Sequence, residues 1–213
     1  ELVIIQNRTR LPVVLSIEEV ERLMQQPDLR TLPGLRDRAL LECLYSTGVR
    51  RSELCALTLG DVSLSRGTLL VRQGKGNKDR LLPVGQRAVY WISRYLDMVR
   101  PELLLGIKEQ TLFLNDYGEP FRDTKLGDRV KRYMKHAGID AKGSCHLLRH
   151  ACATHMLENG AELRYLQAML GHADARATQL YTHVSIRKLA EIHALTHPAK
   201  LTGREPIDLG EPT

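Results

Sequence analysis

The fold of this chain is decided by residues 35–54, which read LRDRALLECLYSTGVRRSEL. The first part of this stretch carries closely spaced apolar side chains and predicts a buried helix over residues 35–46. Gly48 is expected to end that helix, because glycine readily adopts the left-handed conformation that closes a last turn. A second, short helix is predicted over residues 52–59. The sequence therefore presents Arg50 at a junction between two helices.

The segment before this stretch predicts one more helix. Ser16 and Glu19 have the spacing of a capping box, which indicates that an amphipathic helix begins there and runs over residues 17–26. Pro27 and Pro33 are expected to close it off.

The segments after this stretch predict a small sheet among helices. Residues 68–72 and 80–84 are strand-like and flank a glycine-rich turn, which indicates a β-hairpin. A third short strand is expected at residues 112–115. Further helices are predicted over residues 86–99, 123–137, 146–159, 162–170, 175–181 and 186–195, the last with Leu189, Ile192 and Leu195 facing inward.

These elements define the expected fold class as α+β, mostly helical with a small three-stranded antiparallel sheet. One domain is expected over residues 13–197. Residues 1–12 are interpreted as a linker from a missing N-terminal domain, and residues 198–213 as a flexible C-terminal tail.

Composition narrows the class of partner. Of the 213 residues, 43% are hydrophobic and 26% are charged, as in an ordinary globular domain. Lysine and arginine outnumber the carboxylates by 31 to 25, which gives a formal net charge of +6. The excess favours a polyanionic partner, although moderate positive charge also occurs on many soluble surfaces.

Cysteine usage and hydropathy bear on the compartment. Four cysteines lie within apolar helical stretches, which predicts reduced core thiols and no disulfide: Cys43, Cys55, Cys145 and Cys152. No signal peptide is recognisable, and no apolar run approaches the roughly 18 residues of a membrane span. We therefore expect a soluble, cytoplasmic protein with no membrane partner.

Two patches in the first half of the chain are candidates for chemistry. Arg50 follows a helix end, and Glu53 lies three residues on, where it can orient the guanidinium toward a bound anion. The alternative is a surface salt bridge at a helix junction. The expected hairpin tip holds Lys75 and Lys78 among glycines that allow a close approach to a ligand backbone. The alternative there is a solvated turn.

A third patch opens the helix expected over residues 146–159. The spacing of His146 and Arg149 places both on one face near a helix N-terminus, which suits a phosphate. One alternative is a zinc cluster built from neighbouring residues: Cys145, His146, His150, Cys152 and His155. Leu147 argues against the metalloprotease arrangement, which needs a glutamate at that position. The other alternative is a buried helix with satisfied histidines, and for His155 packing is the favoured role.

A fourth patch holds His172, just past the helix end expected at Gly171, and Tyr181 nine residues later. Alone, such a tyrosine is more often a core residue than a nucleophile. Together, the four patches supply a set suited to metal-free phosphoryl transfer to a tyrosine: Arg50, Lys75, His146, Arg149, His172 and Tyr181.

The four motifs resemble those of the tyrosine recombinases, also called the lambda-integrase-like family, and of its bacterial Xer-type branch. They are Thr-Gly-x-Arg-x-Ser-Glu-Leu from Thr47, Gly-Lys-Gly-Asn-Lys from Gly74, His-Leu-Leu-Arg-His from His146 and Leu-Gly-His-x8-Tyr from Leu170. The resemblance extends over about residues 11–193. It implies the catalytic core of a DNA breaking and rejoining enzyme.

The resemblance implies a site-specific recombinase that serves integration, excision or resolution of DNA elements. Tyr181 would become joined to a 3′ phosphate, and Lys75 would protonate the departing 5′ oxygen. The covalent phosphotyrosine conserves the bond energy. Strands would therefore be rejoined, through a Holliday junction, without ATP, metal or any other cofactor.

The other residues would stabilise the transition state. The forks of Arg50 and Arg149 fit the non-bridging oxygens, to which His172 would also donate. His146 would help to deprotonate the tyrosine, with Glu53 holding Arg50 or His146 in place. Direct DNA contacts are expected from three further side chains: Arg51, Lys78 and Arg80.

The implied partner is a double-stranded recombination site, on which four identical or related subunits act pairwise. The family's helical DNA-clamping domain would precede the linker. This chain alone is therefore expected to be a monomer that binds DNA weakly and with strong salt dependence. The helix over residues 186–195 would dock on a neighbouring subunit and regulate cleavage.

Three alternatives remain open at this point. A type IB topoisomerase uses the same tyrosine chemistry, a DNA-binding regulator could retain the fold, and a zinc-stabilised helical module would use the histidines and cysteines. The sequence does not specify the DNA site, an accessory partner, or a role in chromosome dimer resolution, transposition or phage integration. An integron role is disfavoured, because no added helix is recognisable between Tyr133 and His146.

Overall fold

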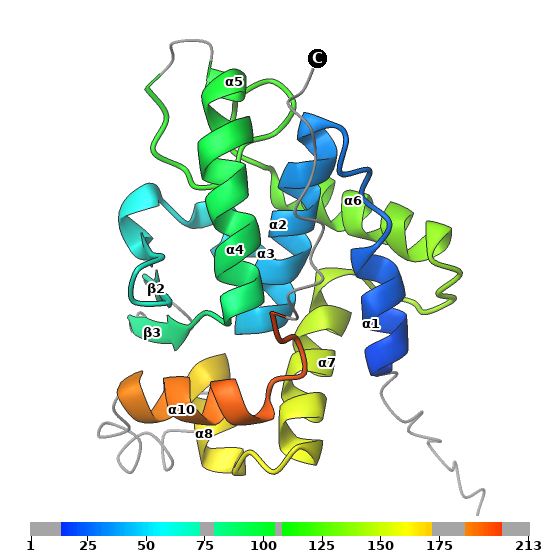
Figure 1. The fold of residues 1–213 in the computed structure, drawn as a ribbon. Coiled ribbons are helices and arrows are strands. Elements are labelled where there is room, and N and C mark those ends of the chain that lie inside the picture. Colours follow the sequence, from blue (N-terminus) through cyan, green and yellow to red (C-terminus); the bar gives the residue numbers. More distant parts are fainter. Residues whose placement is uncertain (1–13, 73–78, 105–107, 172–185, 202–213) are drawn as a thin grey trace, which may run out of the picture.

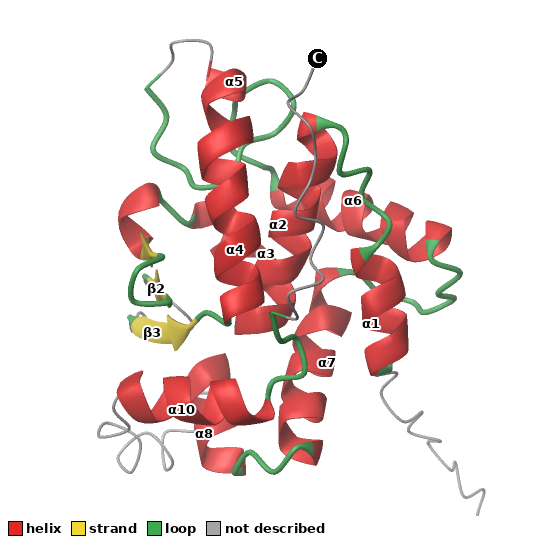
Figure 2. Cartoon of the chain, viewed as in Figure 1, coloured by secondary structure: helices red, strands yellow, loops and turns green. Residues whose placement is uncertain are grey.

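The computed structural model describes residues 14–72, 79–104, 108–171 and 186–201. These residues form a body of packed helices with a small sheet at one edge (Figures 1 and 2). The helices are α1 (Ile17–Met24), α2 (Leu32–Thr47), α3 (Arg51–Ala56), α4 (Gln86–Arg94), α5 (Arg100–Leu104), α6 (Asp123–His136), α7 (Cys145–Glu158), α8 (Leu163–Leu170) and α10 (Ile186–Thr196). A 3₁₀ helix, η1 (Leu59–Asp61), and a π-helix, η2 (Tyr95–Val99), join them, and the strands are β1 (Val62–Ser63), β2 (Thr68–Val71) and β3 (Arg80–Pro83).

Helix α2 is the centre of the fold and is buried along most of its length. It packs against α4 on one side and α7 on another (Figure 1). The helix begins at Leu32, three residues before the predicted start, because Thr31 caps it and Pro33 lies in its first turn. The prediction that Pro33 ends the preceding helix was therefore wrong. The predicted end at Gly48 is confirmed, with φ +60°.

The predicted hairpin is confirmed by an antiparallel pairing of β2 with β3, in which Thr68 lies opposite Pro83 and Val71 opposite Arg80. Its tip, residues 73–78, lies outside the described residues. The third strand is β1, which pairs with β2. The described part of the chain thus has the predicted fold class, but the third strand was predicted at the wrong place.

Residues 112–115 do not join the sheet, and one side chain binds two of their backbone groups. The Tyr95 hydroxyl donates to the Leu112 carbonyl at 3.0 Å and accepts from the Leu114 N–H at 3.0 Å. The segment makes only single bridges, between Thr58 and Thr111 and between Leu114 and Pro120. A buried tyrosine therefore replaces a strand neighbour.

Helix α10 lies against β3 and α7 (Figure 1). The rings of His193 and His197 stack at 4.6 Å, and their Nε2 atoms hydrogen-bond the carbonyl oxygens of Ser46 and Tyr45 in the last turn of α2. Leu189 is buried as predicted, but the prediction for Leu195 was wrong, since it is 79% exposed. Imidazoles, not that leucine, occupy the inner face. The helix predicted at residues 175–181 lies outside the described residues.

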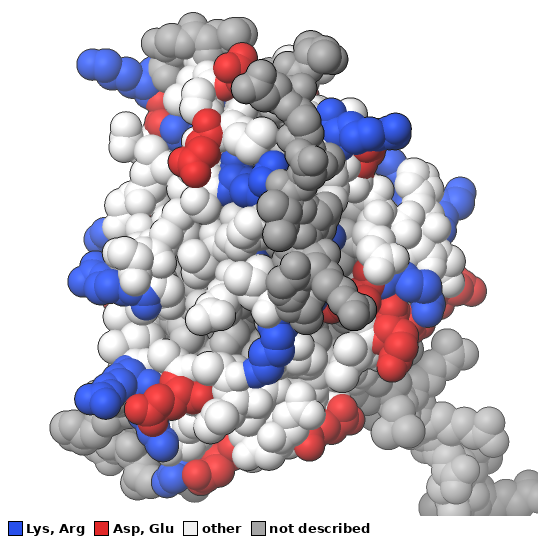
Figure 3. Space-filling view, viewed as in Figure 1, with Lys and Arg blue, Asp and Glu red and all other residues white. Residues whose placement is uncertain are grey.

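On the face in Figure 3, positive and negative side chains are interspersed around a largely uncharged centre.

All four cysteines are free, with Cys55 half-buried and the other three buried. Ala199 is also buried, so ordered packing continues past residue 198, where the tail was predicted to begin. Across the described ranges, no helix combines the length and apolarity that a bilayer crossing requires.

Candidate active site

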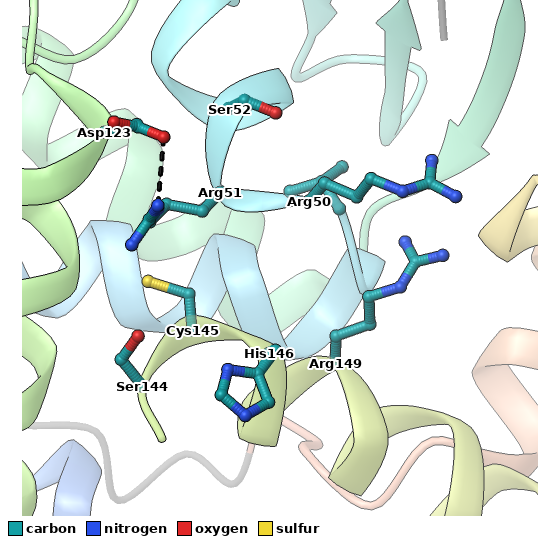
Figure 4. A pocket seen from close by; sticks show the side chains of 9 residues that line it. Arg50, Arg51, Ser52, Asp123, Ser144, Cys145, His146 and Arg149 are labelled. Carbon is teal, nitrogen blue, oxygen red and sulfur yellow. Dashed lines mark hydrogen bonds and ion pairs between the residues drawn. The ribbon is translucent and has the colours of Figure 1, made fainter. Parts of the chain in front are cut away.

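A pocket of about 320 Å³ opens where the beginnings of α3, α6 and α7 meet (Figure 4). It brings together two of the patches singled out in the sequence, Arg50 and the pair His146 and Arg149. The full lining is Val49, Arg50, Arg51, Ser52, Asp123, Ser144, Cys145, His146 and Arg149. Four cationic or basic side chains therefore surround a space large enough for a small anionic group.

Arg50 is the N-cap residue of α3, and Glu53 holds it at two points. The Arg50 backbone N–H donates to Glu53 Oε2 at 2.8 Å, and Arg50 Nη1 donates to Glu53 Oε1 at 2.8 Å. The predicted contact between these residues is confirmed. Because the carboxylate fixes the backbone and the side chain together, the guanidinium has one preferred direction.

Arg149 is held by carbonyl oxygens instead of a carboxylate. Its Nη1 donates to the Gly48 carbonyl at 2.5 Å, and its Nη2 to the Leu170 carbonyl at 2.6 Å. Burial, and then the charges of Arg50 and Arg80, lower its pKa to about 10. Arg149 nevertheless stays cationic at neutral pH. Figure 4 shows its guanidinium extending in the same direction as that of Arg50.

Gly48 makes this arrangement possible. Its φ of +60° is the left-handed conformation, and a Cβ at this position would lie 2.9 Å from Leu170 Cδ2. The ends of α2 and α8 can therefore approach closely enough for Arg149 to reach a carbonyl on each.

Glu53 also binds a second guanidinium, that of Arg80. Arg80 Nη1 donates to Glu53 Oε1 at 2.9 Å, Nη2 to Oε2 at 2.6 Å, and Nε to the Met169 carbonyl at 3.0 Å. Burial raises the pKa of Glu53, but the hydrogen bonds from Arg80 and from the Arg50 backbone outweigh it and lower the pKa to about 2. The Arg80 side chain is 12% exposed. Its expected DNA contact stays a prediction, but in this structure its donors face the protein.

His146 and Arg51 lie on the other side of the pocket. Burial lowers the pKa of His146, with smaller contributions from His150, Arg51 and Lys131. The neutral imidazole is therefore favoured. Arg51 Nη2 pairs with Asp123 Oδ2 at 3.0 Å, as the dashed line in Figure 4 marks.

The residues of the alternative zinc cluster face different environments. His146 and His150 are exposed, whereas His155 is buried and its Nδ1 hydrogen-bonds the Tyr45 hydroxyl at 2.8 Å. The packing role predicted for His155 is confirmed. Within the ranges described, no group of three or more His, Cys, Asp or Glu side chains is placed to hold a metal ion.

Several candidate residues lie outside the described residues: Lys75, Lys78, His172 and Tyr181. Conversely, the sequence interpretation missed Asp123 and Ser144, which line the pocket. Asp123 meets Arg51 across 72 positions of sequence, so no local spacing could have linked them. Ser144 lies two residues before His146, where the third patch was predicted to begin, and this nearness is the signal that could have found it.

The profile of the phage integrase family matches residues 14–188. The chain belongs to that family.

Similar proteins include tyrosine recombinases of the Xer branch, as the motifs predicted. The chain is 55% identical to "Tyrosine recombinase XerC 2" of Ralstonia nicotianae over 188 residues, which are 88% of this chain and 54% of the relative. The chain thus spans about half the length of that relative.

Two solved structures have the same fold. The crystal structure of XerA recombinase matches with a TM-score of 0.69 and 35% identity, over 86% of this chain and 64% of that one. The XerH site-specific recombinase bound to its difH substrate, a pre-cleavage complex, matches with a TM-score of 0.67 and 29% identity. That match covers 85% of this chain and 53% of the other.

Proposed function

We propose that this chain is the catalytic domain, over residues 13–197, of a site-specific tyrosine recombinase that cuts and rejoins DNA through a covalent 3′-phosphotyrosine. The observation that carries the proposal is the paired Arg50 and Arg149 at the wall of one pocket, with cationic charge that carboxylates of the described residues do not balance. Such a site suits a phosphodiester in its transition state, where charge builds on two non-bridging oxygens.

In the cleavage step one bond forms, one bond breaks and two protons are transferred. The Tyr181 oxygen attacks the phosphorus, the bond from phosphorus to the 5′ oxygen breaks, and the 3′ phosphate stays on the tyrosine. His146 accepts the phenolic proton, since its lowered pKa favours the neutral imidazole, which has a ring nitrogen free to accept. Lys75 gives a proton to the leaving 5′ oxygen, and His172 donates to a non-bridging oxygen.

The guanidinium groups carry the electrostatic part of this step. Arg50 and Arg149 each retain N–H donors beyond those bound to the protein, because a guanidinium has five. A phosphate in the pocket would accept hydrogen bonds from these N–H groups as negative charge develops on its oxygens. Glu53 keeps the Arg50 fork in place before the DNA arrives.

Rejoining reverses the same chemistry. A 5′ hydroxyl from a second duplex attacks the phosphotyrosine, so no external energy source or cofactor is required. We propose that four subunits, bound to two double-stranded sites in the DNA-containing compartment of the cell, exchange strands in this way. The complex of XerH site-specific recombinase with its difH substrate supports DNA as the partner.

Covalent capture tests the proposal. DNA recovered from covalent adducts in the cells of origin defines the site, and a nicked suicide duplex of that sequence is then incubated with the pure chain. We expect an adduct on a denaturing gel, its loss in Tyr181→Phe, and its retention in the control Tyr117→Phe, an exposed tyrosine. An adduct that survives Tyr181→Phe would contradict the proposal.

A second assay separates recombination from the topoisomerase alternative. Two marked duplexes are mixed with the protein, and exchanged strands are scored by length. Recombinant products support a recombinase, whereas relaxation of supercoils without exchange would favour a type IB topoisomerase.

A further inference from the structure

Three arginines from three elements converge on the end of α8. Arg80 of β3 donates to the Met169 carbonyl, Arg149 of α7 to the Leu170 carbonyl, and Arg50 at the start of α3 to the Gly171 carbonyl at 3.4 Å. These are consecutive carbonyl oxygens at a helix C-terminus, which carries partial negative charge and lacks intrahelical donors. The end of α8 is therefore an anchor for the guanidinium cluster.

Arg80 is more buried than Arg50, with a side chain 12% exposed against 31%. Its planar fork grips both oxygens of Glu53, the carboxylate that also fixes the Arg50 backbone and side chain. A Cβ at Gly171 would lie 3.3–3.4 Å from three atoms of the Arg80 side chain, so the two are packed in contact. All three of its nitrogens are hydrogen-bonded within the protein, and the side chain is mostly buried.

We propose that Arg80 is a positioning residue for cleavage, which fixes Glu53 and thereby the Arg50 fork, while its bond to Met169 fixes the end of α8. The inference rests on the proposed function, and it replaces the simpler expectation that Arg80 contacts DNA.

The first measurement separates catalysis from DNA binding. Single-turnover cleavage of the suicide duplex is followed at rising protein concentration for wild type, Arg80→Met and Arg72→Gln. Arg72 is a matched control, because it flanks the same hairpin tip, has a side chain 60% exposed and pairs with Asp61.

We expect Arg80→Met to slow the saturating rate about 30- to 100-fold, with the half-saturating concentration within about threefold of wild type. Arg72→Gln should keep the saturating rate within about threefold. A normal saturating rate in Arg80→Met with a raised half-saturating concentration would overturn the proposal in favour of a DNA contact.

A double variant guards against loss of folding, because Arg80→Met alone removes a partner of a buried carboxylate. In Arg80→Met/Glu53→Gln, no carboxylate charge remains to be paired. If Arg80 acts through Glu53, the double variant cleaves within about threefold of the slower single variant. If the rate losses of the two single variants multiply in the double variant, or if the double variant cleaves at the wild-type rate, the result would count against the proposal.

Hydrogen exchange of the DNA-free chain gives a readout that does not depend on cleavage. Peptides over α3 and the last turn of α8 should exchange about tenfold faster in Arg80→Met, and at the wild-type rate in Arg72→Gln. Unchanged exchange would refute the positioning role. A wild-type chain that forms no adduct would instead refute the proposed function, and the exchange result would still decide the role of Arg80.

Discussion

Two arginine clusters of this molecule differ in their balance of charge. In the core, Arg38 and Arg87 share Glu42, which is fully buried, and Arg87 also binds Glu21. Beside the pocket, three guanidiniums lie around one carboxylate: Arg50, Arg80 and Arg149 around Glu53.

The difference in charge balance between the two clusters indicates a difference in function. A buried network in which carboxylates match cations joins helices, here α1, α2 and α4, and leaves no charge for a ligand. A cluster with surplus cations stores repulsion that a bound anion relieves. Arginine alone therefore says little about function, whereas the ratio of guanidinium to carboxylate in each cluster does.

The largest expected effect is on stability, in the balanced cluster. Arg87→Met leaves the buried Glu42 with one guanidinium fewer and should lower the free energy of unfolding by about 3–5 kcal/mol in urea denaturation. Arg164→Met, which removes an exposed ion pair with Glu162, is the control and should cost less than about 1 kcal/mol. Equal losses in the two variants would remove the distinction between the clusters.

The next effect is on catalysis, in the surplus cluster. Arg149→Met should slow covalent cleavage about 10²- to 10³-fold, because it removes a preorganised donor from the transition state. The free energy of unfolding should change by no more than about 1 kcal/mol, since no buried carboxylate loses its partner. A stability loss as large as that of Arg87→Met would show that the pocket arginines are structural.

The carboxylate of the second cluster, Glu53, predicts a pH dependence of stability. The folded-state pKa of Glu53, about 2, lies below its ordinary value of 4.5. Its contribution to stability, about 3 kcal/mol, is therefore present above pH 4.5 and is lost as the pH falls through about 2. Urea denaturation from pH 5 to 2 should show a steeper decline for wild type than for Glu53→Gln, and parallel declines would contradict the assigned pairing.

The smallest effect tests the rim of the pocket. Asp123→Asn releases Arg51 from an exposed ion pair, so the half-saturating DNA concentration should fall about twofold. Stability should change by less than about 0.5 kcal/mol. Asp128→Asn, which removes the same charge from an exposed position of α6, is the control, and an equal gain there would show a general charge effect instead.

Features set by neighbours in sequence could be predicted, and features set by distant contacts could not. Gly48 ends α2 as predicted, and Glu53 holds Arg50 from three positions away. By contrast, Arg80 reaches Glu53 across 27 positions, and Arg149 reaches Gly48 across 101. No periodicity contains that information, because only the assembled fold brings these groups together.

The misplaced strand has a similar cause. Residues 112–115 have the apolar character of a strand, but the hydroxyl of Tyr95 takes the hydrogen bonds that a neighbouring strand would supply. The true third strand, β1, has two residues, too few for an alternating pattern to be recognisable. Propensity therefore identified buried extended chain without identifying its partner.

Gly48 belongs to neither cluster alone, and this has a consequence for mutational tolerance. Its backbone closes α2, its missing side chain admits Leu170, and its carbonyl receives Arg149. In a library of single substitutions, position 87 should be depleted by selection for folding, and position 149 by selection for cleavage. Position 48 should be depleted by both selections, because one atom of added bulk there disturbs the scaffold and the chemistry together.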